Sequence, residues 1–173
     1  RAFEWLLLLP LAMPAYVLAY AYTDMLQFSG AVQSGLRAVL KVDGALWPDV
    51  RSLPGAAALF VLCLYPYVYL LTRAALAERG VQMMEAARML GADGRRRIAV
   101  IALPLARPAI AAGVALALME TMADYGVGAY FGLTTFSTGI YKTWLSMNDP
   151  VAAAMLASML LVVVALLLTI EHR

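Results

Sequence analysis

Apolar residues along this chain collect in long runs that do not alternate with polar residues. The first run, 5–22, has 18 residues without a charge, and the runs 53–72 and 151–170 have 20 each. A fourth run, 108–122, is interrupted only by Glu120. A helix of about 20 apolar residues crosses a hydrocarbon layer of about 30 Å, and in lipid a helix satisfies its own backbone polar groups.

This pattern predicts an all-α fold, a polytopic membrane helix bundle, because continuous apolar runs do not suit the alternating strands of a barrel wall. We expect about four transmembrane helices. Their approximate bounds are 5–22, 53–72, 108–124 and 151–170.

Composition supports a membrane protein and excludes other classes. Of 173 residues, 64% are apolar and 14% are charged, whereas a typical soluble domain has about 25% charged residues. A disordered chain is excluded, because disorder needs low hydrophobicity and high net charge. The single cysteine, Cys63, excludes an intrachain disulfide framework and a cysteine-cluster zinc site.

The basic residues predict an orientation. Seven of the 13 Lys and Arg residues lie in the loop 73–107, whereas the segments 23–52 and 123–150 hold three and one. Loops rich in Lys and Arg stay on the cytoplasmic side of a membrane. Four crossings place Arg1 and Arg173 on the same side as this loop, so we expect both termini and the loop 73–107 to be cytoplasmic.

The cytoplasmic loop predicts a helix–turn–helix elbow beyond the membrane. Residues 81–90 are strong helix formers, and Gly91 is a good helix stop. Asp93 can then cap a second short helix. We expect Pro104 to end this second helix and Pro108 to open the next crossing. Composition alone also allows an amphipathic segment that packs on the bilayer.

The order of residues in the elbow is more specific than its composition. It fits the pattern EAA-x3-G-x9-I-x-LP at every stated position. The residues are Glu85, Ala86, Ala87, Gly91, Ile101, Leu103 and Pro104. This resembles the signature loop of the inner-membrane permeases of binding-protein-dependent ABC importers.

The resemblance implies a function. The chain would be part of a type I importer permease in the bacterial inner membrane, and the seven residues would dock onto cytoplasmic ABC ATPase subunits. A periplasmic substrate-binding protein would deliver the substrate. The chain has no G-x-x-x-x-G-K-[ST] loop, so ATP hydrolysis is expected on a separate chain. We therefore expect a permease subunit that is not an enzyme and has no cofactor, no resident metal and no nucleic-acid partner.

Four segments further resemble the ferric-iron permease branch. They are 9–20, 64–69, 120–126 and 136–141. In that branch one polypeptide commonly carries two permease halves. The sequence begins with Arg1, so the resemblance implies a single partial permease domain over 1–173, whose partners would include a second permease half or subunit.

Glu120, Asp124 and Tyr125 are candidates for the transport pathway. Carboxylates four residues apart share a helix face, and charges at membrane depth tend to face a protein interior or a water-filled cavity. Carboxylate and phenolate oxygens are hard donors, which ferric iron prefers. The alternatives are a pair hydrated at the membrane interface, or a pair that fixes the helix to the loop 126–140.

Other functions remain open at this stage. Within the same superfamily the substrate could be thiamine, a polyamine, phosphonate or sulfate. A membrane scaffold that binds a cytoplasmic partner and transports nothing is the alternative from another class. The run Arg95–Arg97 suits contact with anionic membrane lipid at the cytoplasmic face.

Overall fold

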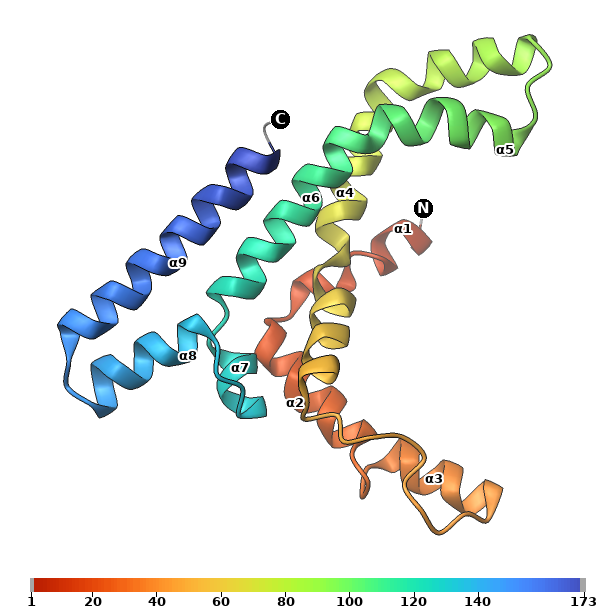
Figure 1. Ribbon diagram of the computed structural model, residues 1–173. Coiled ribbons are helices and arrows are strands. Elements are labelled where there is room, and N and C mark those ends of the chain that lie inside the picture. Colours follow the sequence, from red (N-terminus) through yellow and green to blue (C-terminus); the bar gives the residue numbers. More distant parts are fainter. Residues whose placement is uncertain (1, 172–173) are drawn as a thin grey trace. The chain divides into compact units, whose positions relative to one another are not determined.

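The computed structural model describes the backbone of residues 2–171, and their side chains apart from those of residues 2, 79, 170 and 171. Arg1 and Arg173 lie outside the described residues. Within the described part of the chain every regular element is helical (Figure 1). The elements are α1 (Ala2–Leu6), the 3₁₀ turn η1 (Leu9–Ala12), α2 (Ala15–Leu26), α3 (Ala31–Leu40), α4 (Leu53–Met89), α5 (Gly94–Arg97), the π-helical turn η2 (Ile98–Ala102), α6 (Leu103–Ala123), α7 (Gly126–Phe131), α8 (Phe136–Tyr141), the π-helical turn η3 (Lys142–Ser146) and α9 (Pro150–Glu171).

Three stretches of helix are long and apolar enough to cross a membrane. They are Leu53–Glu78, Gly94–Ala123 and Pro150–Thr169. They include most of the predicted crossings 53–72, 108–124 and 151–170. The predicted fold class, an all-α membrane helix bundle, is confirmed.

The first predicted crossing differs from this pattern, because residues 5–22 do not form one long helix. The stretch is divided among α1, η1 and the first part of α2. Pro10 lies in the 3₁₀ turn and Pro14 precedes the first residue of α2. Each proline lacks a backbone N–H and clashes with the preceding turn of an α-helix, so two prolines four residues apart divide the apolar run.

The described chain separates into two compact units. One consists of Arg1–Leu64 with Thr121–Val163, and the other of Tyr65–Glu120 with Val164–Arg173. We call them the first and second unit and describe each by itself.

The first unit has a small apolar core formed by α2, the start of α4 and α7. Ala19 of α2 and Val127 of α7 are completely buried, and Leu59 and Cys63 of α4 are 4% and 3% exposed. Small residues let these helices approach closely, as is typical of helix packing in membranes.

The second unit packs α4 against α6 at a glycine. Gly113 of α6 is buried, and a Cβ atom added to it would lie 2.6 Å from the backbone Cα of Val68 in α4. No larger residue fits unless the helices separate. The missing side chain at Gly113 therefore lets α4 and α6 pack closely.

Candidate functional site

The signature motif lies in a helical hairpin of the second unit, formed by the end of α4, by α5 and η2, and by the start of α6. Glu85, Ala86 and Ala87 lie in α4, and the later motif residues are Gly91 in the turn, Ile101 in η2, and Leu103 and Pro104 in α6. In Figure 1 the yellow-green end of α4 runs to the turn and α5 follows directly. The turn uses Gly91, whose φ of 79° lies in the left-handed region that glycine adopts readily. The N–H groups of Gly91 and Ala92 donate to the carbonyls of Arg88 and Ala87, both at 3.0 Å. These bonds satisfy carbonyls that the end of α4 would leave free.

The second arm begins with the predicted cap. The carboxylate of Asp93 accepts a hydrogen bond from the backbone N–H of Arg96 at 3.0 Å. It thereby satisfies one of the N–H groups that a helix start leaves unpaired. The prediction that Gly91 stops one helix and Asp93 caps the next is confirmed.

The arms of this elbow are longer than predicted. Its first arm is not a separate short helix, because α4 continues without interruption from Leu53 to Met89. On the second arm, Gly94–Ala123 is continuous helix. Pro104 does not end a helix and Pro108 does not open one, since both lie inside α6.

The π-helical turn explains why Pro104 is tolerated. Pro104 is the second residue of α6 and has no N–H to donate. Directly before it, the N–H of Leu103 donates to the carbonyl of Ile98, five residues back. This wider turn shifts the hydrogen-bond pattern before the proline, so the helix passes it without a break.

The motif residues differ in their exposure. Glu85, Ala86 and Gly91 are exposed, whereas Ala87 is only 9% exposed. At the tip, Met89 and Leu90 are 88% and 87% exposed. Large apolar side chains that are exposed next to small residues are typical of a surface that binds another protein.

The elbow borders an open cavity of about 330 Å³ that the sequence did not predict. Glu85 and Arg88 line it from α4, and Arg97 lines it from α5. The Nε atom of Arg97 is buried without a hydrogen-bond partner among the described residues. The sequence predicted contact with anionic lipid for the run Arg95–Arg97, whereas in the folded hairpin Arg97 lines the same cavity as Glu85.

The three pathway candidates belong to different units, Glu120 to the second and Asp124 and Tyr125 to the first. The helix α6 ends at Ala123, so Asp124 does not continue the helix face of Glu120. The carboxylate of Asp124 accepts a hydrogen bond from the N–H of Val127 at 2.7 Å, and the ring of Tyr125 lies 4.2 Å from that of Tyr141. Asp124 thus makes the kind of contact expected if it fixes α6 to the loop that follows. Among the described residues, no group of three or more His, Cys, Asp or Glu side chains could hold a metal ion.

The family model that matches this sequence is that of the binding-protein-dependent transport system inner membrane component, and the match covers residues 1–170. The chain belongs to this family. The elbow with the EAA motif is thus part of an ABC importer permease.

The permease is also similar to curated proteins from Salmonella. Those of Salmonella paratyphi A and Salmonella typhimurium carry the provisional name 2-aminoethylphosphonate transport system permease protein PhnU. Each is 25% identical over 150 residues, which cover 85% of this chain and 52% of the relative. The chain spans about half the length of the curated relatives it matches.

These relatives support the permease function and do not support the ferric-iron branch specifically. They are named for a phosphonate, which is among the alternative substrates that the sequence left open. The family is an inner-membrane component, which agrees with the predicted localisation, while the predicted orientation stays a prediction.

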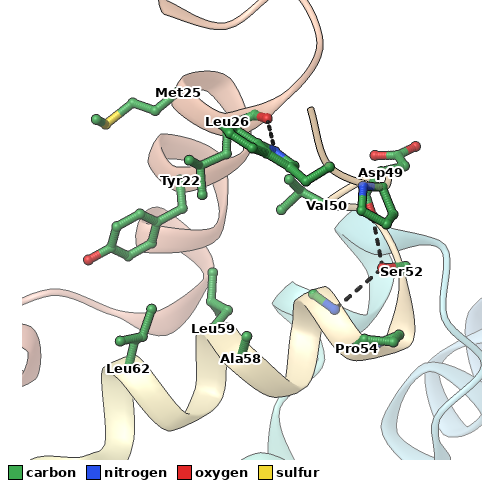
Figure 2. A pocket seen from close by; sticks show the side chains of 13 residues that line it. Tyr22, Met25, Leu26, Asp49, Val50, Ser52, Pro54, Ala58, Leu59 and Leu62 are labelled. Atoms are coloured by element: carbon green, nitrogen blue, oxygen red, sulfur yellow. Dashed lines mark hydrogen bonds between the residues drawn. The ribbon is translucent and has the colours of Figure 1, made fainter. Parts of the chain in front are cut away.

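The first unit of the permease contains an apolar pocket of about 570 Å³ (Figure 2). It lies between α2, which contributes Tyr22 and Met25, and the start of α4, which contributes Leu59 and Leu62. Figure 2 shows these four side chains around the pocket, and the segment 47–52 borders it. Its walls are mostly apolar, and Asp49 and Ser52 are the polar residues that line it.

Proposed function

We propose that this permease chain couples a separate ATPase to the import of a substrate that a binding protein delivers. The family membership gives the class of transporter. The observation that carries the coupling role is the elbow, in which Glu85, Ala86 and Gly91 are exposed on a capped turn.

The continuity of the helices supports this role. The first arm of the elbow belongs to α4, and the second arm passes through the π-helical turn into α6 without a break. A force applied at the elbow would therefore act directly on helices that are apolar enough to cross the membrane. Separate short helices joined by loops would transmit the same displacement poorly.

Charge reversal at Glu85 tests the docking proposal. We expect Glu85→Lys to lower the amount of ATPase that co-purifies with the full transporter at least tenfold. Glu78→Lys is the matched control, because Glu78 is also an exposed residue of α4 and lies outside the motif. Equal recovery of the ATPase with both variants would show that the elbow does not dock through Glu85.

For the substrate we propose first ferric iron, as the resemblance of four segments of the chain indicates. Glu120 and Asp124 would contribute oxygen donors at the outer end of α6. The double variant Glu120→Gln with Asp124→Asn tests this in the full transporter, because Asn can still accept the hydrogen bond from Val127. Iron uptake unchanged at normal expression would reject these two residues as pathway groups.

The second candidate substrate is 2-aminoethylphosphonate, and the names of the curated relatives favour it. Uptake of labelled iron and of labelled 2-aminoethylphosphonate by cells that express the full transporter and its binding protein separates the two candidates. Import of one compound, abolished by Glu85→Lys and not by Glu78→Lys, identifies the substrate and links it to the elbow.

A further inference from the structure

The first unit contains a second cavity, of about 450 Å³, whose walls are about half polar. It lies between the end of α2, the helix α3 and the segment 45–51. The polar side chains around it are those of Thr23, Gln27, Ser29, Gln33, Asp49 and Arg51. The segment 47–50 borders the apolar pocket of Figure 2 as well, so an apolar and a more polar cavity adjoin one stretch of chain.

Hydrogen bonds hold the walls of the polar cavity in place. The carbonyl of Leu26, the last residue of α2, accepts from Gln33 Nε2 at 3.2 Å and from Trp47 Nε1 at 2.8 Å. The other end of the Gln33 amide accepts from the backbone N–H of Leu46 at 3.3 Å. Gln33 is only 2% exposed. These bonds tie α2, α3 and the segment 45–47 together before any ligand binds.

Thr23 contributes a polar group with no partner. It is 1% exposed, and its hydroxyl oxygen makes no hydrogen bond with any described residue. Inside a helix a threonine hydroxyl usually bonds to the carbonyl of the preceding turn. An unsatisfied buried hydroxyl costs free energy. Because Thr23 lines the cavity, a ligand there could satisfy this hydroxyl.

The cavity carries one charge of each sign. Arg51 donates from a guanidinium N–H to the hydroxyl of Tyr130 at 2.8 Å, and its guanidinium carbon lies 4.5 Å from the centre of that ring. Because a guanidinium has five N–H groups, others remain for a ligand. One oxygen of the Asp49 carboxylate accepts from the backbone N–H of Arg51 at 2.9 Å. Within the described part of the chain no ion pair joins the side chains of Asp49 and Arg51.

We propose that this cavity binds a small zwitterion that carries an oxyanion at one end and an ammonium group at the other. Arg51 binds the oxyanion and Asp49 binds the ammonium group, while Thr23 and the Gln27 amide hydrogen-bond to the ligand between its charged ends. The volume lies within the range of about 300–1,000 Å³ that is usual for ligand sites. A simple anion would leave Asp49 without a partner of opposite charge, and a simple cation would leave Arg51 without one. An apolar ligand would leave both residues unpaired.

The inference rests on the proposed importer function, and it favours the second candidate substrate, 2-aminoethylphosphonate, over ferric iron. Binding is measured by calorimetry on the full permease purified with its ATPase. The probe is 2-aminoethylphosphonate, and methylphosphonate and ethanolamine carry one of its charges each. We expect the zwitterion to bind at least tenfold more tightly than either half. Equal binding of the three compounds, or binding of none, would overturn the proposal.

Two threonines provide a matched pair of variants. Thr23→Val keeps the shape of the side chain and removes the hydroxyl, and we expect at least fivefold weaker binding with unchanged or higher thermal stability. Thr72→Val is the control, because the Thr72 hydroxyl is also buried without a described partner but lies outside this cavity. We expect its affinity to stay within twofold of the wild type. Equal affinity of the two variants would remove Thr23 from the site.

Arg51→Gln tests the charge. We expect it to weaken binding of 2-aminoethylphosphonate at least tenfold, and to abolish its advantage over ethanolamine. Arg51→Lys should recover part of the affinity, which a purely structural role beside Tyr130 would not predict. An effect of Arg51→Gln on thermal stability alone, with wild-type affinity, contradicts the site.

The experiments distinguish failure of the cavity proposal from failure of the proposed transport function. Recovery of the ATPase depends on Glu85 at the elbow and does not involve the cavity. Wild-type import by the Thr23 and Arg51 variants would reject the cavity and leave the importer in place. Loss of the ATPase partnership in the wild type would reject the importer.

Discussion

At the scale of single residues, two variants of Asp124 can distinguish a structural role of this residue from a role in transport. Its carboxylate accepts a 2.7 Å hydrogen bond from the N–H of Val127, a completely buried residue. We predict that Asp124→Ala destabilises the protein by about 1–3 kcal/mol, because it leaves a buried donor unpaired. Asp124→Asn keeps the acceptor and should stay near the wild type in thermal unfolding.

Transport by the same two variants completes this prediction. A purely structural Asp124 predicts that Asp124→Asn transports normally and that Asp124→Ala loses transport in proportion to its stability. If Asp124→Asn is stable but transports poorly, the negative charge itself is needed, and the pathway role gains support over the capping role.

Asp93 makes a second prediction for a single residue. Its side chain caps α5 through the N–H of Arg96. We expect Asp93→Ala to destabilise the second arm of the elbow by about 0.5–2 kcal/mol. Hydrogen exchange of the backbone amides of residues 95–97 measures this locally. Asp43→Ala is the control, because Asp43 is an exposed residue of a loop, and unchanged exchange in Asp93→Ala would contradict the cap.

At the scale of elements, the packing of α4 on α6 depends on Gly113. A Cβ atom at this position would lie 2.6 Å from the Cα of Val68, and backbone cannot move aside as a flexible side chain can. We predict that Gly113→Ala lowers the free energy of unfolding by about 1–3 kcal/mol through overpacking. Thermal unfolding of the purified permease measures the change.

Gly35 gives the control for this substitution. It lies in α3, where a Cβ atom would meet nothing within 4 Å. Alanine favours a helix over glycine by about 1 kcal/mol, so Gly35→Ala should unfold at the same or a higher temperature. If Gly113→Ala also stabilises the protein, α4 and α6 do not pack as closely as described.

Much of the helical structure could be predicted from the sequence, because the signals are local. Runs of apolar residues define α9 and much of α4 and α6, and the turn of the elbow follows from Gly91 and Asp93. The same local reading overestimated the effect of Pro104. The π-helical turn that lets the helix continue past Pro104 could not be predicted, because the sequence around this proline has no distinct signal for such a turn.

The ligand groups of the polar cavity could not be predicted, because they meet only through the fold. Arg51 is positioned by Tyr130, which is 79 residues away in the sequence. Thr23 directly follows the apolar run 5–22, and Gln33 lies in the segment 23–52. No local pattern in the sequence indicates that these two polar side chains are buried, at 1% and 2% exposed. Non-local contacts of this kind leave no periodicity in the sequence.

At the scale of the whole molecule, the orientation in the membrane is the prediction that remains to be tested. Seven of the 13 basic residues lie in the loop 73–107, so the positive-inside rule places the elbow in the cytoplasm. The single Cys63 is 3% exposed, and Cys63→Ser provides a cysteine-free background. In this background Arg95→Cys and Asp43→Cys place one thiol each at exposed positions.

We expect a membrane-impermeant maleimide added to intact spheroplasts to label Asp43→Cys, and to label Arg95→Cys only after the membrane is opened. The segment 23–52 would then face outward, on the side from which a binding protein delivers its ligand, and the polar cavity would lie on that side too. Labelling of Arg95→Cys in intact spheroplasts would invert the topology. It would place the elbow out of reach of a cytoplasmic ATPase, and the coupling proposal could not stand.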